Sequence, residues 1–270
     1  ISYRLVGSEM CIRDRCIALP DGLTVSGTAI TEALQAALGP EAILVGGTAA
    51  DQFRMQACRL LFNDEVLNDA VPLLLLSGPL EVGVGIDSGW SPVGELVEVT
   101  QSTGNLVARI GDHTAVEFYR QRFGEHVIPD AEYPLALHDP ANDTSCLRAP
   151  LVLHDDGSVM FAGDIPQGSL VRITDSTRAD ILQACANSVR AAFTDLDAPN
   201  PDGALVFSCA ARRLVLGTQT AEELRTLQGA SPTPLPIAGF YTYGEIAAPC
   251  RGEPAQFHNE TFVTVLLAEV

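Results

Sequence analysis

The segment that most restricts the fold lies at the C-terminal end of the chain, where two strand-like stretches enclose a polar insert. Residues 235–243 and 262–270 are apolar and are predicted to be strands. Strands of a protein core seldom need polar side chains such as those that lie between these two stretches and at their ends. Aromatic hydroxyls and short polar side chains at the ends of adjacent strands are typical of a small-molecule pocket. We therefore expect a ligand pocket at Tyr241, Tyr243, Gly244, Glu245, His258, Asn259, Glu260 and Thr261.

The charge of the chain excludes several classes of protein. Its 270 residues are enough for two domains, and 34 acidic residues face 16 basic ones, for a net charge of -18. Such a charge repels phosphate backbones and anionic lipids, so we expect no nucleic-acid partner and no membrane partner. All the basic residues are arginine, which excludes a lysine Schiff base and a Walker-type phosphate loop.

The cysteines indicate a reducing compartment. There are seven, an odd number without a C-x-x-C pair, and several lie in apolar stretches. This pattern suits buried free thiols better than a disulfide framework, so we expect a cytoplasmic protein. Residues 1–15 do not fit the rest of the chain. They resemble translated sequencing-adapter sequence, and we expect them to be a non-native artefact segment.

The remaining pattern predicts an α/β architecture of the α+β type, with mixed, mainly antiparallel sheets packed against helices. Ser26 is expected to cap a helix that Gly39 ends, and residues 177–193 repeat apolar side chains at helical spacing. A helix is also predicted over 210–227, broken near Gly217, and hairpins are predicted at Asn63-Asp64 and at residues 147–162. A change in composition near residues 100–111 places the domain boundary, giving domains 16–108 and 109–270.

Several motifs resemble the FIST domains, which are sensory modules of bacterial signalling proteins. Residues 20–22, 46–51, 77–79, 83–85 and 89–92 are similar to the second half of the FIST N-terminal domain. Residues 147–148, 208–212, 239–245 and 258–261 are similar to the FIST C-terminal domain. The first strand-helix-strand portion of the N-terminal domain is missing by this comparison, so we expect exposed apolar surface where it would pack.

The resemblance implies a sensory protein that binds a small polar metabolite, such as an amino acid, and signals through a partner protein. It implies no enzyme activity and no cofactor. Two other functions stay open: a cysteine-dependent hydrolase that uses Cys209 and His258, and an interaction scaffold without a ligand. Cys209 follows a buried strand and is expected to open a helix, where the helix dipole would favour its thiolate.

Six residues are candidates for ligand binding, and each has a structural alternative. Glu245 and the two tyrosines would bind an ammonium group and orient the ligand, or Glu245 would accept bonds from the following loop. His258 and Asn259 would contact the ligand, or they would fix the start of the last strand; a metal site is not expected there, because no second histidine lies at ligand spacing. Arg212 would bind a carboxylate at the rim, or it would pair with a helix glutamate. Strand alternation predicts Tyr241, Tyr243 and Glu245 on one face.

Overall fold

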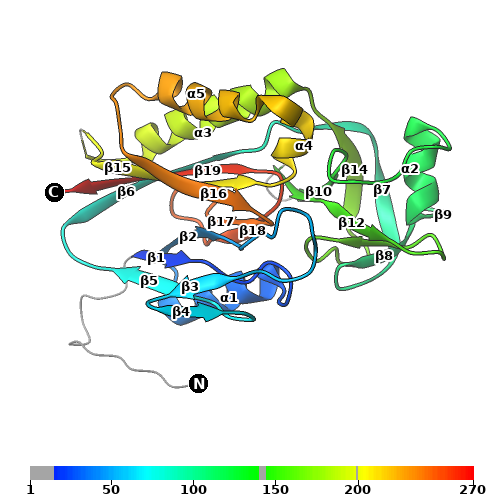
Figure 1. Cartoon of the computed structure of the whole chain (residues 1–270). Coiled ribbons are helices and arrows are strands. Elements are labelled where there is room, and N and C mark those ends of the chain that lie inside the picture. The colour runs from blue at the N-terminus through cyan, green and yellow to red at the C-terminus, as the bar shows by residue number, and fades with distance from the viewer. Residues whose placement is uncertain (1–14, 140–143, 199) are drawn as a thin grey trace.

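The computed structural model describes residues 15–139, 144–198 and 200–270. Two stacked sheets form the centre of the molecule, with helices on both outer faces, and a third, larger sheet extends to one side (Figure 1). The α/β class with mixed, mainly antiparallel sheets is confirmed: among the named strands described, only the β1–β2 and β15–β16 pairs are parallel. The proposed artefact segment lies outside the described residues except for Arg15, which begins the first strand.

The two stacked sheets combine strands from both ends of the chain. The upper sheet has the order β16 (Ile237–Thr242), β15 (Gly203–Cys209), β19 (Phe262–Glu269) and β6 (Leu80–Asp87). The lower sheet has the order β18 (Gln256–His258), β17 (Glu245–Ala247), β2 (Ile43–Gly47), β1 (Arg15–Ala18) and β5 (Leu73–Leu76). Both sheets therefore contain strands from each of the two predicted domains.

The side sheet also joins the two halves of the sequence. Its order is β11 (Thr144–Arg148), β10 (Leu135–Asp139), β14 (Leu170–Asp175), β7 (Ser91–Thr103), β8 (Leu106–Ile110), β13 (Val159–Phe161) and β12 (Pro150–Leu153), with β9 (His113–Thr114) beside β8. A small hairpin pairs β3 (Leu60–Phe62) with β4 (Glu65–Leu67). Both predicted hairpins are present, because turn residues separate short complementary strands in each.

Three of the helices begin where side-chain caps satisfy their first amides. The Ser26 hydroxyl accepts a bond from Ala29 N at the start of α1 (Gly27–Leu38), and Gly39 follows its end. Thr114 and Thr177 form capping boxes at α2 (Ala115–Phe123) and α3 (Arg178–Asp195). The predicted helix over 210–227 is divided into α4 (Arg212–Leu216), a 3-10 turn (Gly217–Gln219) and α5 (Ala221–Ala230). Neither α4 nor α5 has a side-chain cap.

One hydrophobic core fills the space between the two stacked sheets, and a larger one packs the side sheet against α2. Val45 of the lower sheet packs with Phe207, Val263 and Val265 of the upper one. Gly47 allows this close approach, since a Cβ there would lie 2.4 Å from Thr242 Cγ2 of the upper sheet. Gly46 allows close pairing within the lower sheet, because a Cβ there would lie 1.9 Å from the carbonyl oxygen of Ala18.

Strand β5 forms one edge of the lower sheet and carries exposed apolar side chains. Leu73, Leu74 and Leu75 are 40%, 53% and 41% exposed. Exposed apolar surface was expected in the N-terminal domain, and what would pack against this strand stays a prediction. No helix in the described part of the chain is long and apolar enough to cross a membrane.

Candidate functional site

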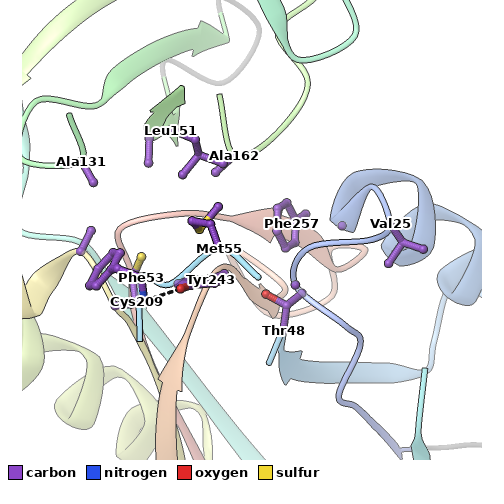
Figure 2. A pocket seen from close by; sticks show the side chains of 15 residues that line it. Val25, Thr48, Phe53, Met55, Ala131, Leu151, Ala162, Cys209, Tyr243 and Phe257 are labelled. Atoms are coloured by element: carbon purple, nitrogen blue, oxygen red, sulfur yellow. Dashed lines mark hydrogen bonds between the residues drawn. The ribbon is translucent and has the colours of Figure 1, made fainter. Parts of the chain in front are cut away.

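A pocket lies where the stacked sheets meet the side sheet. Its cavity volume is about 60 Å³. Three separate parts of the chain form its walls, and Figure 2 shows Met55 between Leu151 and Ala162 on one side and Tyr243 on the other. The walls are Gly22, Val25, Gly27, Thr48, Phe53 and Met55; Ala131, Ala149, Leu151 and Ala162; and Cys209, Ala210, Ala211, Tyr243 and Phe257. The lining is mostly apolar, with Thr48, Tyr243 and Cys209 as its polar side chains.

Three glycines leave the space that the Phe257 ring occupies in the pocket wall and allow close packing beside it. A Cβ on Gly27 would lie 2.3 Å from the Phe257 ring, and a Cβ on Gly244 would lie 2.1 Å from the same ring. A Cβ on Gly22 would lie 2.2 Å from the carbonyl oxygen of Ala49. These three glycines therefore fix the position of Phe257 and the close packing around Tyr243.

The loop over residues 51–57 forms the mouth of the pocket and is held in an unusual conformation. Gln52, Phe53 and Met55 all have positive φ angles, of 62°, 62° and 51°. Phe53 and Met55 are also 40% and 43% exposed, although both line the pocket. Left-handed backbone in residues other than glycine is costly and is concentrated at ligand-binding and switch regions. The loop therefore has the conformation expected of a functional segment.

Asp51 and Tyr243 hold this loop. The Tyr243 hydroxyl donates to Asp51 Oδ1 over 2.6 Å and accepts from Phe53 N over 2.5 Å. The Asp51 carboxylate also accepts from the amides of Met55, Gln56 and Ala57. Burial acts against ionisation of Asp51, but these hydrogen bonds, first that of Tyr243, lower its pKa to about 2. Burial and the bond to Asp51 raise the pKa of Tyr243 to about 12.

Arg212 does not lie at the rim of a pocket but forms a closed cluster beneath the helices. Its side chain is fully buried, and Nε donates to Glu223 Oε1 over 2.8 Å. The Glu223 carboxylate also accepts from the hydroxyls of Ser208 and Tyr241, at 3.1 and 2.9 Å. Burial, followed by the charge of Glu223, raises the pKa of Tyr241. The structural alternative for Arg212, pairing with a helix glutamate, is therefore what the structure contains.

Glu245 lies on the opposite side of the upper sheet from this cluster. It is fully buried, and its carboxylate accepts bonds from the hydroxyl of Thr242 and from the hydroxyl and amide of Thr261, the last two at 2.7 and 3.2 Å. Burial raises its pKa to about 7 despite these bonds. The predicted shared face is wrong. Strand β16 ends at Thr242, and Glu245 begins β17 in the lower sheet, so strand alternation does not continue between Tyr241 and Glu245.

Asn259 and Glu260 follow β18 directly behind the pocket wall. Asn259 Nδ2 donates to the carbonyl of Tyr243 over 3.3 Å, and Cys209 N donates to the carbonyl of Thr261 over 3.0 Å. Both residues are buried. Within the described chain Asn259 Oδ1 has no hydrogen-bonding partner, and the weakly donating thiol of Cys209 is the group that approaches the Glu260 carboxyl. Burial and then the charge of Glu245 raise the pKa of Glu260 well above its usual value. The hydrogen bonds of these buried polar groups are therefore incomplete within the described chain.

The expected nucleophile does not have the environment that catalysis requires. Cys209 ends β15 and precedes α4 by two residues, so it does not open that helix. Burial, together with the nearby charges of Glu245 and Glu260, raises its pKa well above the usual value. His258 Nε2 lies 3.0 Å from the carbonyl oxygen of Ala247, and its ring approaches Cys146 instead. The structure therefore does not support the Cys209–His258 hydrolase.

The structure thus separates the six predicted site residues. Tyr243 lines the pocket, and Asn259 contacts its backbone from behind. Tyr241 and Arg212 belong to the closed cluster, whereas Glu245 and His258 are buried between sheets. In the described residues, no group of three or more His, Cys, Asp or Glu side chains is arranged to hold a metal ion.

Sequence reasoning missed several residues of the pocket. Asp51 belongs to the 46–51 motif, which the sequence indicates only as part of the fold. Phe53 and Met55 come after it in a stretch without helical or strand periodicity. An apolar pair beside an aspartate in a stretch without helical or strand periodicity is the one signal that would have indicated a binding loop.

Comparison with protein families gives two matches that together cover most of the chain. The family described as the FIST N domain matches residues 4–113, and the family described as the FIST C domain matches residues 115–248. The comparison with curated proteins gave no match. The matched ranges contain the motifs identified in the sequence, except residues 258–261, which lie beyond the second match.

Proposed function

Since this chain belongs to the FIST-domain proteins, whose domains are sensory modules of signal-transduction proteins, we propose that it detects a small metabolite in the pocket beside Tyr243. It passes the bound state to a partner protein and performs no chemistry on the ligand. The observation that supports this proposal most is that three separate parts of the chain form the pocket walls. A ligand in such a position contacts all three at once and can change their relative stability.

The chemistry of the pocket supports a particular kind of ligand. Its walls are mainly apolar, which suits a small aliphatic or aromatic group. The buried polar groups of Asn259 and Glu260 lie behind the pocket wall at Tyr243 and Cys209 rather than in its lining, and their incomplete hydrogen bonds suit a ligand that brings N–H donors to this wall. A small metabolite that carries an amine and an apolar body, such as an amino acid with an apolar side chain, has both properties.

The strained mouth loop supports a role in signalling. Phe53 and Met55 cover the pocket from a loop that is held by Asp51 and Tyr243. A ligand that packs against both apolar side chains would favour the present loop conformation over alternatives. The loop is therefore the element whose equilibrium the ligand would shift, and its surface is where a partner would detect the change.

A thermal-shift experiment with a panel of amino acids and related amines tests the proposal. A ligand present at 100 times its dissociation constant should stabilise the protein by about 2.7 kcal/mol. Ala162→Leu fills the pocket and should remove this effect, whereas Ala33→Leu, on an exposed position of α1, should not. If no compound stabilises the protein, or if Ala162→Leu binds as tightly as the original chain, the proposal is wrong and the scaffold alternative gains support.

A further inference from the structure

A group of reactive side chains lies beside the pocket wall and has no role in the proposed ligand binding. Cys146 and Arg148 are two residues apart on β11, so their side chains share one face of that strand. Arg148 Nη1 lies 2.8 Å from the sulfur of Cys146. The ring of His258, from β18, approaches the same sulfur. The fold thus brings a thiol, a guanidinium and an imidazole together from two distant segments.

Arg148 requires a negative charge that its other neighbours do not supply. The residue is 7% exposed, and within the described chain no carboxylate pairs with it. Its guanidinium donates instead to the carbonyl oxygens of Asp164, Leu147 and Phe257, at 3.2, 2.9 and 3.2 Å. A buried cation is costly without an anionic partner. The sulfur of Cys146 is the group in contact that can carry that charge.

The neighbours of the sulfur favour the thiolate over the thiol. The thiol donates only long, weak hydrogen bonds to backbone carbonyls, to Phe257 O at 3.7 Å and Leu147 O at 3.9 Å. His258 Nε2 carries a proton for its 3.0 Å bond to Ala247 O, which leaves Nδ1 to accept the thiol proton. Burial opposes ionisation, but the charge of Arg148 and the contacts of His258 outweigh it and lower the pKa of Cys146 to about 7.

The buried cysteines Cys16, Cys185 and Cys209 have the opposite environment. Burial raises the pKa of Cys16 to about 11 and that of Cys185 to about 12, and Cys209 is raised well above its usual value. Cys146 is partly exposed, whereas those three are buried. A thiolate that is stabilised by a cation, in a residue that is partly exposed, has the environment of a reactive cysteine.

We propose that Cys146 is a redox modification site, at which a hydroperoxide oxidises its thiolate to a sulfenic acid. The sulfur attacks one peroxide oxygen, an S–O bond forms, and the O–O bond breaks. The sulfur loses two electrons and the peroxide gains them. The departing oxygen leaves as an alcohol or water, with a proton from the His258 imidazolium that received the thiol proton. Arg148 remains protonated and stabilises the negative charge on sulfur before the attack and on oxygen during it.

The position of this site connects it to the pocket. Arg148 Nη1 bonds both the sulfur of Cys146 and the carbonyl of Phe257, whose ring lines the pocket. A neutral sulfenic acid no longer supplies Arg148 with an anion, so oxidation would alter the contact that supports the pocket wall. The modification site does not depend on the proposed ligand function, because its chemistry uses no pocket residue.

Brief alkylation of the native protein with iodoacetamide at pH 7 tests the site, with each cysteine read separately by mass spectrometry. Exposed Cys250 is the internal reference. Cys146 should react about tenfold faster than Cys250, because its larger thiolate fraction outweighs its lower intrinsic nucleophilicity. Arg148→Met should abolish the difference, and Arg148→Lys, which retains the charge, should restore part of it. Equal or slower reaction of Cys146 in the original chain overturns the proposal, whether or not the variants fold.

Oxidation is measured on the same protein. Treatment with hydrogen peroxide in the presence of dimedone, which traps sulfenic acids, should label Cys146 before any other cysteine. Cys146→Ser should remove this label and leave labelling of Cys250 unchanged. If another cysteine is labelled first, Cys146 is not the hydroperoxide site. The same conclusion follows if Cys146 reacts quickly with iodoacetamide but gains no dimedone label.

Discussion

Two buried polar clusters lie on opposite faces of strand β15, and they differ in whether their hydrogen bonds are complete. On the helix side, Ser208 joins the cluster of Arg212, Glu223 and Tyr241, in which the Glu223 carboxylate accepts three bonds. On the other side, Glu260 has only the weakly donating thiol of Cys209 beside its carboxyl, so its hydrogen bonds are incomplete within the described chain. Adjacent residues of one strand therefore contribute to two different environments.

The difference between these clusters separates structural from functional polar groups. A buried group with all its partners stabilises one conformation, and removing either partner is costly. A buried acceptor without a donor lowers stability unless a ligand or water supplies the missing bond. Such an incomplete set of hydrogen bonds occurs at Glu260, beside the pocket. This location supports a site that accepts hydrogen bonds from a group outside the chain.

The largest effect is expected from breaking the complete cluster. Arg212→Met should lower the free energy of unfolding by about 3–5 kcal/mol, because Glu223 is then left charged and buried. Denaturant titration measures this loss. The matched control is Arg225→Met, which breaks an exposed pair with Glu222 and should cost less than about 1 kcal/mol. A similar small loss for both variants would show that the buried cluster is not structural.

A smaller effect is expected from the titration of Glu245. Its pKa in the folded protein is about 7, above the usual 4.5, so its contribution to stability is complete below pH 4.5 and is lost as the pH rises toward 7. The loss should be about 3 kcal/mol. Glu245→Gln cannot titrate at this position, so the difference between the two stability curves over this range isolates the effect. Parallel curves would contradict the raised pKa.

The smallest effect is expected from the incomplete cluster, and its sign is opposite to that of Arg212→Met. Glu260→Met removes a buried carboxyl whose hydrogen bonds are incomplete and keeps a similar volume, so it should raise the free energy of unfolding by about 1–2 kcal/mol. The same variant should weaken binding of any amine found in the thermal-shift panel. A loss of stability instead would show that Glu260 has a structural role and that the two clusters are alike.

Local sequence signals predicted much of the fold. The cap at Ser26 and the apolar repeat over 177–193 predicted α1 and α3 closely, because capping and helical periodicity depend on residues a few positions apart. The turn residues at Asn63-Asp64 predicted the β3–β4 hairpin for the same reason. The family motifs predicted both FIST domains, and both are found.

The candidate site was predicted only in part, because its geometry depends on how the sheets are stacked. Tyr243 was expected in the pocket and lines it, whereas Glu245 was expected beside it and lies between the sheets. The reason is the change of sheet after Thr242, where the chain leaves β16 and enters β17. Strand β17 pairs with β2 from the other end of the chain, and no local pattern encodes that pairing.

The sequence by itself therefore determined the helices, the hairpins, the family and the general location of the polar residues. The tertiary structure alone decided which of those residues are paired. It pairs Arg212 with Glu223, gives Glu260 only the Cys209 thiol as a neighbour among the described residues, and places His258 beside Cys146 rather than Cys209. The physical reason is that pKa values and hydrogen-bond completion depend on burial and on neighbours that are distant in sequence, whereas capping and periodicity depend on neighbours that are close.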